Sequence, residues 1–558
     1  MTAVATPAAP RTRPAPARRW VRLAPWVAFA AAALPLIVPA VAIAVRAPTI
    51  HWAGDRALTE LGVREAARGH QLLGIGGRFG WRHPGPVWMQ LLVPGYELTG
   101  HAPWSLSVGV LLIHVAMVAI AVFAAYRGAG ARGAALVATG VAVYLRATGL
   151  LYWTNLWAGY AFTWPMLALV VVGALAMAAP RAGWAVPAAL LLGTLMVQTD
   201  VSTALPVVAI GAVAFGVRLA RVGPRRFLAG PARAADAADA ADAAGGRRHW
   251  SGGPVSPTAA ALLALAVVAW IPPIVQQATN NPGNVTLLVR FARQGAGGYP
   301  LRTAAAAVGA ALSVFPIGAR WVLHPQLQAD LGRGPWWAVA VAGASVGLSV
   351  AAAVVGWRRG RRFAGDLALL SATAIVAGVV AISRVDGPLN FYFLTWISVL
   401  PVPAVAAAVL ALAPSGGEVD VVAVVALVIA VAFSIGVVVT QGTEHDWDRR
   451  ASADVGAETS LAVRALGPAA RGLVLVHVVT SDTWPDAAGV ALQLERRGAR
   501  IEVDPGWVFL FGDAFKPRAV TPSAELWFAR PHEAPVMREV PGADRLGNVG
   551  GIDVYARR

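Results

Sequence analysis

The sequence predicts an α-helical polytopic membrane protein with about eleven transmembrane helices and a small C-terminal extracytoplasmic α/β domain. Of its 558 residues, 57% are apolar and 13% are charged, whereas a soluble domain averages about 45–50% and about 25%. The apolar residues form continuous runs, and about 20 such residues span a bilayer as a helix. Because the runs do not alternate with polar residues, they exclude an outer-membrane barrel.

The first apolar run, 23–45, follows an arginine-rich tail, 1–22. It is longer than the roughly 7–15 apolar residues of a signal peptide, so we expect a first transmembrane helix behind a cytoplasmic tail. An additional run, 303–319, would break the alternation of basic loops if it crossed the membrane, and we expect it to be re-entrant or peripheral. The other runs of the transmembrane domain, 23–440, are 104–126, 133–147, 158–179, 184–198, 201–219, 258–275, 336–357, 366–383, 391–413 and 419–440.

Arginines flank alternate ends of these runs, and such ends face the cytoplasm of the cell (plasma) membrane. The 46 basic and 29 acidic residues, net +17, therefore indicate topology, and we expect no nucleic-acid partner. With the N-terminus inside and an odd number of crossings, the C-terminal domain lies outside. The same holds for the loops 46–103, 148–157, 273–335 and 384–390, whereas 223–257, with its Ala-Asp repeat, is a cytoplasmic linker. The arginines are Arg127, Arg132, Arg181, Arg218, Arg221, Arg225, Arg226, Arg358, Arg359, Arg361 and Arg362.

The C-terminal region, 441–558, has short apolar runs at 472–479 and 500–503 around a helix-spaced stretch at 484–497. This pattern predicts a strand, helix, strand unit, with further strands at 524–528 and 552–555. The turn after Val479 lacks the glycines that bring a backbone against a pyrophosphate, so we expect no nucleotide site. The chain has no cysteine, which excludes disulfides, thiolate metal sites and cysteine nucleophiles.

The outer loop 46–103 is long and lacks a disorder-type composition, which indicates local structure or function. Residues 56–68 have helical spacing and Pro86 opens a second helix, and we expect both helices to lie on the outer leaflet. Asp55 stands directly before the first helix. It is either an N-cap or a catalytic carboxylate at the membrane surface. In the structural alternative, Glu60 and Glu65 are likewise solvated charges on a surface helix.

The outer segments contain a set of short motifs: Gly54-Asp55, Glu60-Leu61, Arg64, Gly69, Gly80-Trp81, His83-Pro84-Gly85-Pro86, Trp153 to Trp157, Val197-Gln198-Thr199-Asp200, Trp270-Ile271-Pro272-Pro273, Gln276, Gln277, Gly283 and Asn284. Together they resemble the GT-C superfamily of polytopic membrane glycosyltransferases, of actinobacterial type. Relatives include aminoarabinose transferases, protein O-mannosyltransferases and arabinofuranosyltransferases. The resemblance covers about residues 20–440 and implies a GT-C-like transmembrane domain. It also implies transfer of a sugar from a polyprenyl-phosphate carrier to an envelope acceptor on the outer face, with inversion.

The resemblance implies that Asp55 is the general base that takes the proton of the acceptor hydroxyl. Glu60, in the same loop, is a secondary candidate. For the leaving phosphate we favour Arg384 and then Arg290, because a guanidinium binds two phosphate oxygens. Each candidate has a structural alternative: a turn residue, a buried hydrogen-bond partner, or an arginine at the membrane interface. The other substrate-binding candidates are His83, Asp200, Gln198, Gln276 and Tyr392.

The expected partners are the lipid-linked sugar donor, an envelope glycan, lipid or protein acceptor, and the lipid bilayer. No cofactor is assigned with certainty, and an Asp-bound divalent cation stays open. Two other functions also stay open: a multi-span transporter or lipid flippase, and a noncatalytic envelope-assembly protein. A transporter commonly has ionisable residues near the midplane and related halves, whereas here the charges stand mainly at the ends of the runs.

Overall fold

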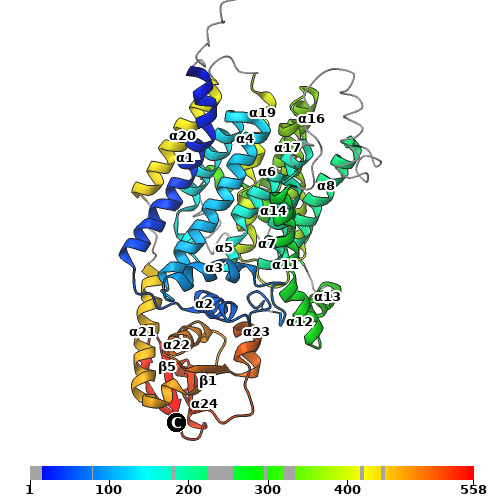
Figure 1. Ribbon diagram of the computed structural model, residues 1–558. Helices are drawn as coiled ribbons and strands as arrows, with labels where there is room; N and C mark the ends of the chain where they lie inside the picture. The colour runs from blue at the N-terminus through cyan, green and yellow to red at the C-terminus, as the bar shows by residue number, and fades with distance from the viewer. Residues whose placement is uncertain are drawn as a thin grey trace, which may run out of the picture.

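The computed structural model describes residues 16–77, 79–178, 183–222, 256–294, 298–317, 334–414, 420–440 and 446–558. The first part of the basic tail and nearly all of the linker 223–257 lie outside these residues. Figure 1 shows a bundle of long helices stacked on a smaller α/β domain, with α2 (Gly54–Ala67) and α3 (Val87–Leu98) between the two. Helix α2 is mostly buried between the two parts, whereas α3 keeps Leu91 and Leu98 exposed. That these helices lie on the outer leaflet stays a prediction.

The chain is a helical membrane protein. In the described residues, eight helical segments are long and apolar enough to cross a membrane, and shorter apolar helices pack among them. The long helices are α1 (Pro16–Arg46), α4 (Trp104–Thr148), α8 (Ala204–Val222), α11 (Pro257–Val268) continued by α12 (Ile271–Thr279), α16 (Trp336–Arg358), α17 (Arg362–Ser383), α18 (Thr395–Ser398) continued by α19 (Pro401–Leu412), and α20 (Val421–Thr440). The shorter ones are α6 (Thr163–Ala178), α7 (Ala185–Thr199) and α14 (Leu301–Ile317).

Helix α4 is a hairpin of two antiparallel halves. Ala129 and Gly130 have non-helical backbone angles, with φ +65° at Gly130, which glycine adopts without strain. The ring of His114, in the first half, lies 5.8 Å from that of Trp153, which follows the second half. The two predicted runs 104–126 and 133–147 therefore correspond to the two halves of α4. The number of membrane crossings stays a prediction, because α6 and α7 are shorter than the eight segments that are long enough to cross a membrane.

Helix α14 corresponds to the predicted run 303–319, whose last two residues lie outside the described part. It is not peripheral, because Ala304 and Ala310 are fully buried in the bundle core. A Cβ on Gly309 would come within 1.7 Å of the Ala338 carbonyl oxygen, so small residues let α14 pack closely on α16. Arg302 Nε, in its first turn, donates to Gly334 O at 3.2 Å. The chain is thus back at the same end of the bundle by Gly334, as a re-entrant segment requires.

One end of the bundle, which we call the basic end, gathers the arginines that the sequence places at alternate run ends. Arg132 Nε lies 2.9 Å from Asp420 Oδ2, and Arg221 forms a bidentate pair with the buried Asp366 at 2.6 Å for both bonds. The predicted outer segments lie at the opposite end, which carries the α/β domain and which we call the domain end. Which end faces the cytoplasm stays a prediction.

The α/β domain is a five-stranded sheet with strand order β2-β1-β3-β5-β4. Strands β1, β2 and β3 are parallel and β5 pairs antiparallel with both β3 and β4. The predicted strand, helix, strand unit and the two further strands are present, whereas β4 and the long helix α21 have no counterpart in the sequence prediction. The elements are α21 (Asp446–Leu466), β1 (Leu473–Val478), α22 (Trp484–Arg496), β2 (Arg500–Val503), α23 (Val508–Phe511), β3 (Ala524–Ala529), α24 (Ala534–Arg538), β4 (Asp544–Val549) and β5 (Ile552–Arg557).

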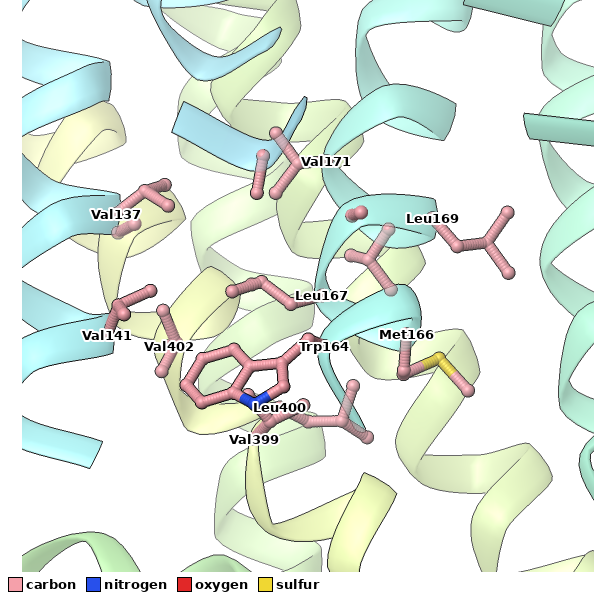
Figure 2. Close-up of a cluster of buried hydrophobic side chains, with 14 of the residues drawn as sticks. Val137, Val141, Trp164, Met166, Leu167, Leu169, Val171, Val399, Leu400 and Val402 are labelled. Atoms are coloured by element: carbon pink, nitrogen blue, oxygen red, sulfur yellow. The ribbon is translucent and has the colours of Figure 1, made fainter. Parts of the chain in front are cut away.

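Two hydrophobic cores hold the molecule together. The larger core lies within the bundle, and Figure 2 shows part of it, where Trp164 and Leu167 of α6 face Val141 of α4 and Val402 of α19. The second core joins apolar side chains of the first loop, such as Leu61 and Met89, to those of the sheet and α22. The first loop and the C-terminal domain therefore share one core.

Candidate active site

Asp55 lies in the first turn of α2, at the domain end of the bundle. The helix begins at Gly54 and its N-cap is Ala53, so Asp55 is not the cap, and that interpretation is wrong. The side chain is half-buried, and its carboxylate makes no hydrogen bond or ion pair with any residue that the structure describes. Burial raises the pKa of Asp55 to about 6, and the positive charge of Arg56 opposes this rise. The result is a carboxylate that is ionised at neutral pH and more basic than usual.

A cavity of about 430 Å³ lies beside the start of α2. It is bounded by the end of α1, the segment before α2, the first turn of α4 and the first turns of α21. Trp52 Nε1 is buried and has no hydrogen-bond partner in the described part of the chain. Arg56 lies over the Trp52 ring, 5.6 Å from its centroid, and donates through Nε to Asn155 Oδ1 at 3.2 Å. The residues that line the cavity include Thr49, His51, Trp52, Ala53, Arg56 and Arg449.

Glu60, the secondary catalytic candidate, lies among protein side chains that bind it. It is fully buried, and its two oxygens accept from Arg496 of α22 at 2.8 and 2.5 Å. The Tyr96 hydroxyl also donates to it at 2.7 Å. Glu60 does not line the cavity beside the start of α2, and its environment favours a structural ion pair. Glu65 is 5% exposed, so neither glutamate is the solvated surface charge that the helix pattern predicts.

His83, Asp200 and Gln198 come together where α3 meets the end of α7. His83 Nδ1 accepts from Val201 N at 3.2 Å and lies 3.9 Å from Asp200 Oδ1. Burial lowers the pKa of His83, although the Asp200 charge opposes this shift. Asp200 Oδ1 accepts from Ser202 N at 2.8 Å, which is the turn role that the sequence left open. His83 is the most exposed of the three.

Gln198 and Gln276 are both buried and hydrogen-bonded to other parts of the chain, and Gln198 Oε1 has no partner among the described residues. Gln198 is fully buried and its Nε2 donates to Ala269 O at 2.8 Å, which joins α7 to the turn before α12. Gln276 is 5% exposed, and its Oε1 accepts from Asn284 N, the first residue of α13 (Asn284–Gln294), at 3.0 Å. In these positions neither amide reaches a ligand without a local rearrangement.

Arg384 and Arg290 are both exposed at the domain end, on different elements. Arg384 is the C-cap of α17 and Arg290 lies on α13. Neither side chain is paired with an acidic residue that the structure describes. Tyr392 is half-buried, and its ring lies edge-on to that of Trp157 at 4.8 Å. These three residues remain candidates for the substrate.

Sequence reasoning missed Arg82, a buried cation that ties three elements together. The Asn284 side chain binds the Arg82 backbone twice: Arg82 N donates to Asn284 Oδ1 at 2.9 Å, and Asn284 Nδ2 donates to Arg82 O at 2.8 Å. Its Nε donates to Gly74 O at 2.9 Å, and its Nη1 would lie 2.7 Å from a Cβ on Gly512, which has φ +118°. Burial lowers the pKa of Arg82 to about 10, with Asp513 opposing the shift. The run Trp81-Arg82-His83 carried no signal of this role, because the contacts lie about 200 and 430 residues away.

Among the described residues, no three His, Asp or Glu side chains come together as a metal site. Two crystal structures of ArnT from Cupriavidus metallidurans are similar to this chain, one bound to undecaprenyl phosphate and one in the apo state. Each alignment has 14% identity and a TM-score of 0.37, and covers 93% of this chain and 97% of that chain. No protein-family model and no curated protein matches the chain. Similarity at this level does not assign the chain to a family.

Proposed function

We propose that the protein is a GT-C-like membrane glycosyltransferase that moves a sugar from a polyprenyl-phosphate carrier to an acceptor of the cell envelope. The observation that carries this proposal is the Asp55 carboxylate, which is half-buried, unpartnered among the described residues and more basic than usual. It stands at the membrane end of a structured loop whose motifs resemble those of lipid-carrier glycosyltransferases.

In the proposed reaction, the acceptor hydroxyl oxygen attacks the anomeric carbon of the sugar. Asp55 takes the hydroxyl proton as this bond forms, because a neutral hydroxyl is a poor nucleophile. The bond between the anomeric carbon and the phosphate oxygen breaks, and the polyprenyl phosphate leaves with both electrons. A single displacement inverts the anomeric centre and requires no second carboxylate, which agrees with the engagement of Glu60 by Arg496.

The surroundings of Asp55 support this chemistry in two ways. The cavity at the start of α2 is lined by residues on both sides of Asp55, Ala53 and Arg56, and Asp55 itself is not among the lining residues. Arg56 and Arg449 bring positive charge to the lining, which suits an anionic group of a substrate. The cavity also adjoins the ends of α1 and α4, where a lipid-borne substrate would enter from the membrane. Arg384 and Arg290 supply exposed guanidinium groups at the same end for the lipid phosphate.

The test uses purified full-length protein, a panel of polyprenyl-phosphate-linked sugars and an envelope extract as acceptor, with released polyprenyl phosphate as the readout. The Asp55→Asn variant keeps the size of the side chain and loses its basicity. We expect its turnover to fall by about 10²–10⁴-fold, with thermal stability close to wild type. Asp544→Asn, which alters an exposed carboxylate on β4 with no side-chain partner among the described residues, is the control and should keep its activity. Near-normal release by the Asp55→Asn variant would remove the proposed base.

The same assay distinguishes the transporter alternative. A flippase would move the lipid-linked sugar across vesicle membranes without releasing polyprenyl phosphate. In the described spans, the ionisable pair Arg221 and Asp366 lies at the basic end of the bundle, with α17 starting at Arg362. Ionisable residues of transporters typically lie near the midplane, so this pair does not favour a transport site.

A further inference from the structure

The helix that carries Asp55, α2, packs along its length against one helix of the C-terminal domain, α22. At its start, the side chains of Trp484 and Pro485 lie 3.5 Å from the position that a Cβ on Gly54 would occupy. Further along α2, Arg496 pairs with Glu60 through two hydrogen bonds. Helix α22 therefore contacts the first turn of α2, which carries Asp55, and the second turn, which carries Glu60.

Arg496 holds the chain on both sides of Asp55. Its Nε and Nη2 donate to the Glu60 carboxylate at 2.8 and 2.5 Å, and its Nη1 donates to Ile50 O at 3.2 Å. Ile50 precedes Asp55 by five residues and Glu60 follows it by five residues. A planar guanidinium that binds a carboxylate with two bonds fixes its orientation as well as its distance. One side chain of α22 thus fixes the segment in the middle of which Asp55 lies.

The neighbouring Glu495 extends this contact toward the end of α2. Its Oε1 lies 3.2 Å from Arg64 Nε and 2.8 Å from Arg68 Nη1. Arg68 also pairs with Glu65 of α2. The charges alternate along the interface, and the apolar side chains between them belong to the core that the first loop and the domain share. The interface with α22 is therefore continuous along α2, and α3 supports α2 as well, with Met89 against Gly62.

We propose that the C-terminal domain positions the base-bearing helix, with Arg496 as the positioning residue. This inference rests on the proposed function of Asp55. Arg496 does not contact Asp55 and does not itself line the cavity, although its hydrogen-bond partner Ile50 does, so it acts on catalysis through the placement of α2 and of the segment before it. Misplacement of a catalytic group by about 1 Å costs about 10²-fold in rate, so loosening α2 lowers kcat more than it changes KM.

The test compares Arg496→Gln, Arg496→Lys and Arg497→Gln in the full-length protein. Arg497 is the matched control, because it is adjacent and exposed and its Nη1 donates to Gln493 O within its own helix. We expect about a 10- to 100-fold lower kcat for the Gln variant, little change in KM and faster amide hydrogen exchange across α2. The Lys variant should be intermediate, because lysine keeps the charge and loses the planar fork. Arg497→Gln should match wild type.

A pH profile adds a readout that a general loss of stability would not move. Burial is the main cause of the raised pKa of Asp55. Among the described residues, Arg56 is the charged group that acts on the Asp55 carboxylate, and its charge lowers this pKa. Loosening α2 admits water, so the acidic limb of the rate profile should move to lower pH in Arg496→Gln. A folded Arg496→Gln protein with wild-type kcat, acidic limb and hydrogen exchange overturns the inference.

Two outcomes separate this inference from the proposed function. If Arg496→Gln does not fold, Glu495→Gln takes its place, because it loosens Arg64 and Arg68 while leaving the Glu60 pair intact. We then expect faster exchange confined to the second half of α2, and unchanged exchange there overturns the inference. If wild type releases no polyprenyl phosphate, the proposed function fails, and hydrogen exchange still decides whether α22 holds α2.

Discussion

At the scale of single residues, two carboxylates five positions apart on one helix have opposite environments. Glu60 is fully buried and bound by Arg496 and Tyr96, whereas the carboxylate of Asp55 is half-exposed and has no partner among the described residues. Removing one partner of a buried ion pair costs about 3–5 kcal/mol, so a Glu60 variant loses activity through destabilisation. Loss of activity in a Glu60 variant therefore does not test catalysis, whereas loss of activity in Asp55→Asn without loss of stability would support a catalytic role for Asp55.

The first residue-scale prediction concerns the pH dependence set by Arg56. A general base must be deprotonated, so the rate should fall as the pH drops through the pKa of Asp55, about 6. The positive charge of Arg56 lowers this pKa. Arg56→Gln should therefore raise the pKa and move the acidic limb of kcat to higher pH, whereas Arg56→Lys should leave it near wild type. An acidic limb that stays in place, or moves down, in Arg56→Gln would contradict this assignment.

The second residue-scale prediction concerns the cation for the lipid phosphate. Arg384 is exposed at the domain end and has no acidic partner among the described residues. Arg384→Gln removes the charge and the fork, so it should bind the lipid donor more weakly and turn over more slowly, with Arg384→Lys intermediate. Donor affinity is measured by titrating the lipid into the purified protein. If the Gln variant is unchanged in affinity and turnover, the assignment moves to Arg290.

At the scale of elements, sequence patterns predicted what depends on local periodicity. Apolar runs, and proline at the start of α3, located the bundle helices, α2, α3 and most strands. Helix α21 was missed because it is amphipathic and follows a long apolar run without a clear stop. The role of Glu60 was missed because its partner Arg496 is 436 residues away. A charged residue on the polar face of a predicted helix is buried when an element distant in sequence packs on that face. The pattern of the helix itself does not show that such an element exists.

One element-scale prediction concerns the outer face of the sheet, where a row of charges crosses the strands. His477 Nδ1 lies 2.7 Å from Asp504 Oδ1 and its Nε2 lies 2.9 Å from Glu525 Oε2, and Glu525 pairs with Arg557 at 2.5 Å. Burial lowers the pKa of His477, but the hydrogen bonds and charges of the two carboxylates outweigh it and raise the pKa above the usual 6.5. The charged imidazole therefore stabilises the folded domain below pH 6.5, and this contribution is lost as the pH rises through the raised pKa.

The corresponding experiment measures thermal unfolding of the full chain at about pH 6 and about pH 9, values on either side of the histidine titration. His477→Gln should lower the unfolding temperature more at the lower pH than at the higher one. His532→Gln, which alters an exposed histidine of the same domain, is the control and should have no such pH-dependent effect. A His477→Gln effect of equal size at both pH values would contradict the charged imidazole.

At the scale of the whole molecule, the two ends of the bundle differ in kind. The basic end is held by arginine pairs and by arginines that cap helix ends, such as Arg359 Nη1, which donates to Leu412 O at 2.8 Å. The domain end is held by a hydrophobic core that joins segments from 46–103 and 446–558. A chain that gathers its arginines at one end and a folded domain at the other has two chemically distinct faces. The candidate site lies between the bundle and the domain, where the lipid-borne substrate of the proposed reaction would reach it.

The last prediction is the direction in which the molecule crosses the membrane. The arginine-rich ends face the cytoplasm by the positive-inside rule, so Asp55 and the residues after Thr440 should face the outside. An alkaline phosphatase fused after Arg558 should therefore be active in intact cells, and a fluorescent protein that folds only in the cytoplasm should be dark there. Fusions after Gly360, in the turn between α16 and α17 at the basic end, should give the opposite pattern. A C-terminal fusion that is active only in the cytoplasm would invert the molecule and place Asp55 on the cytoplasmic face, where a carrier-linked sugar displayed outside the cell would not reach it.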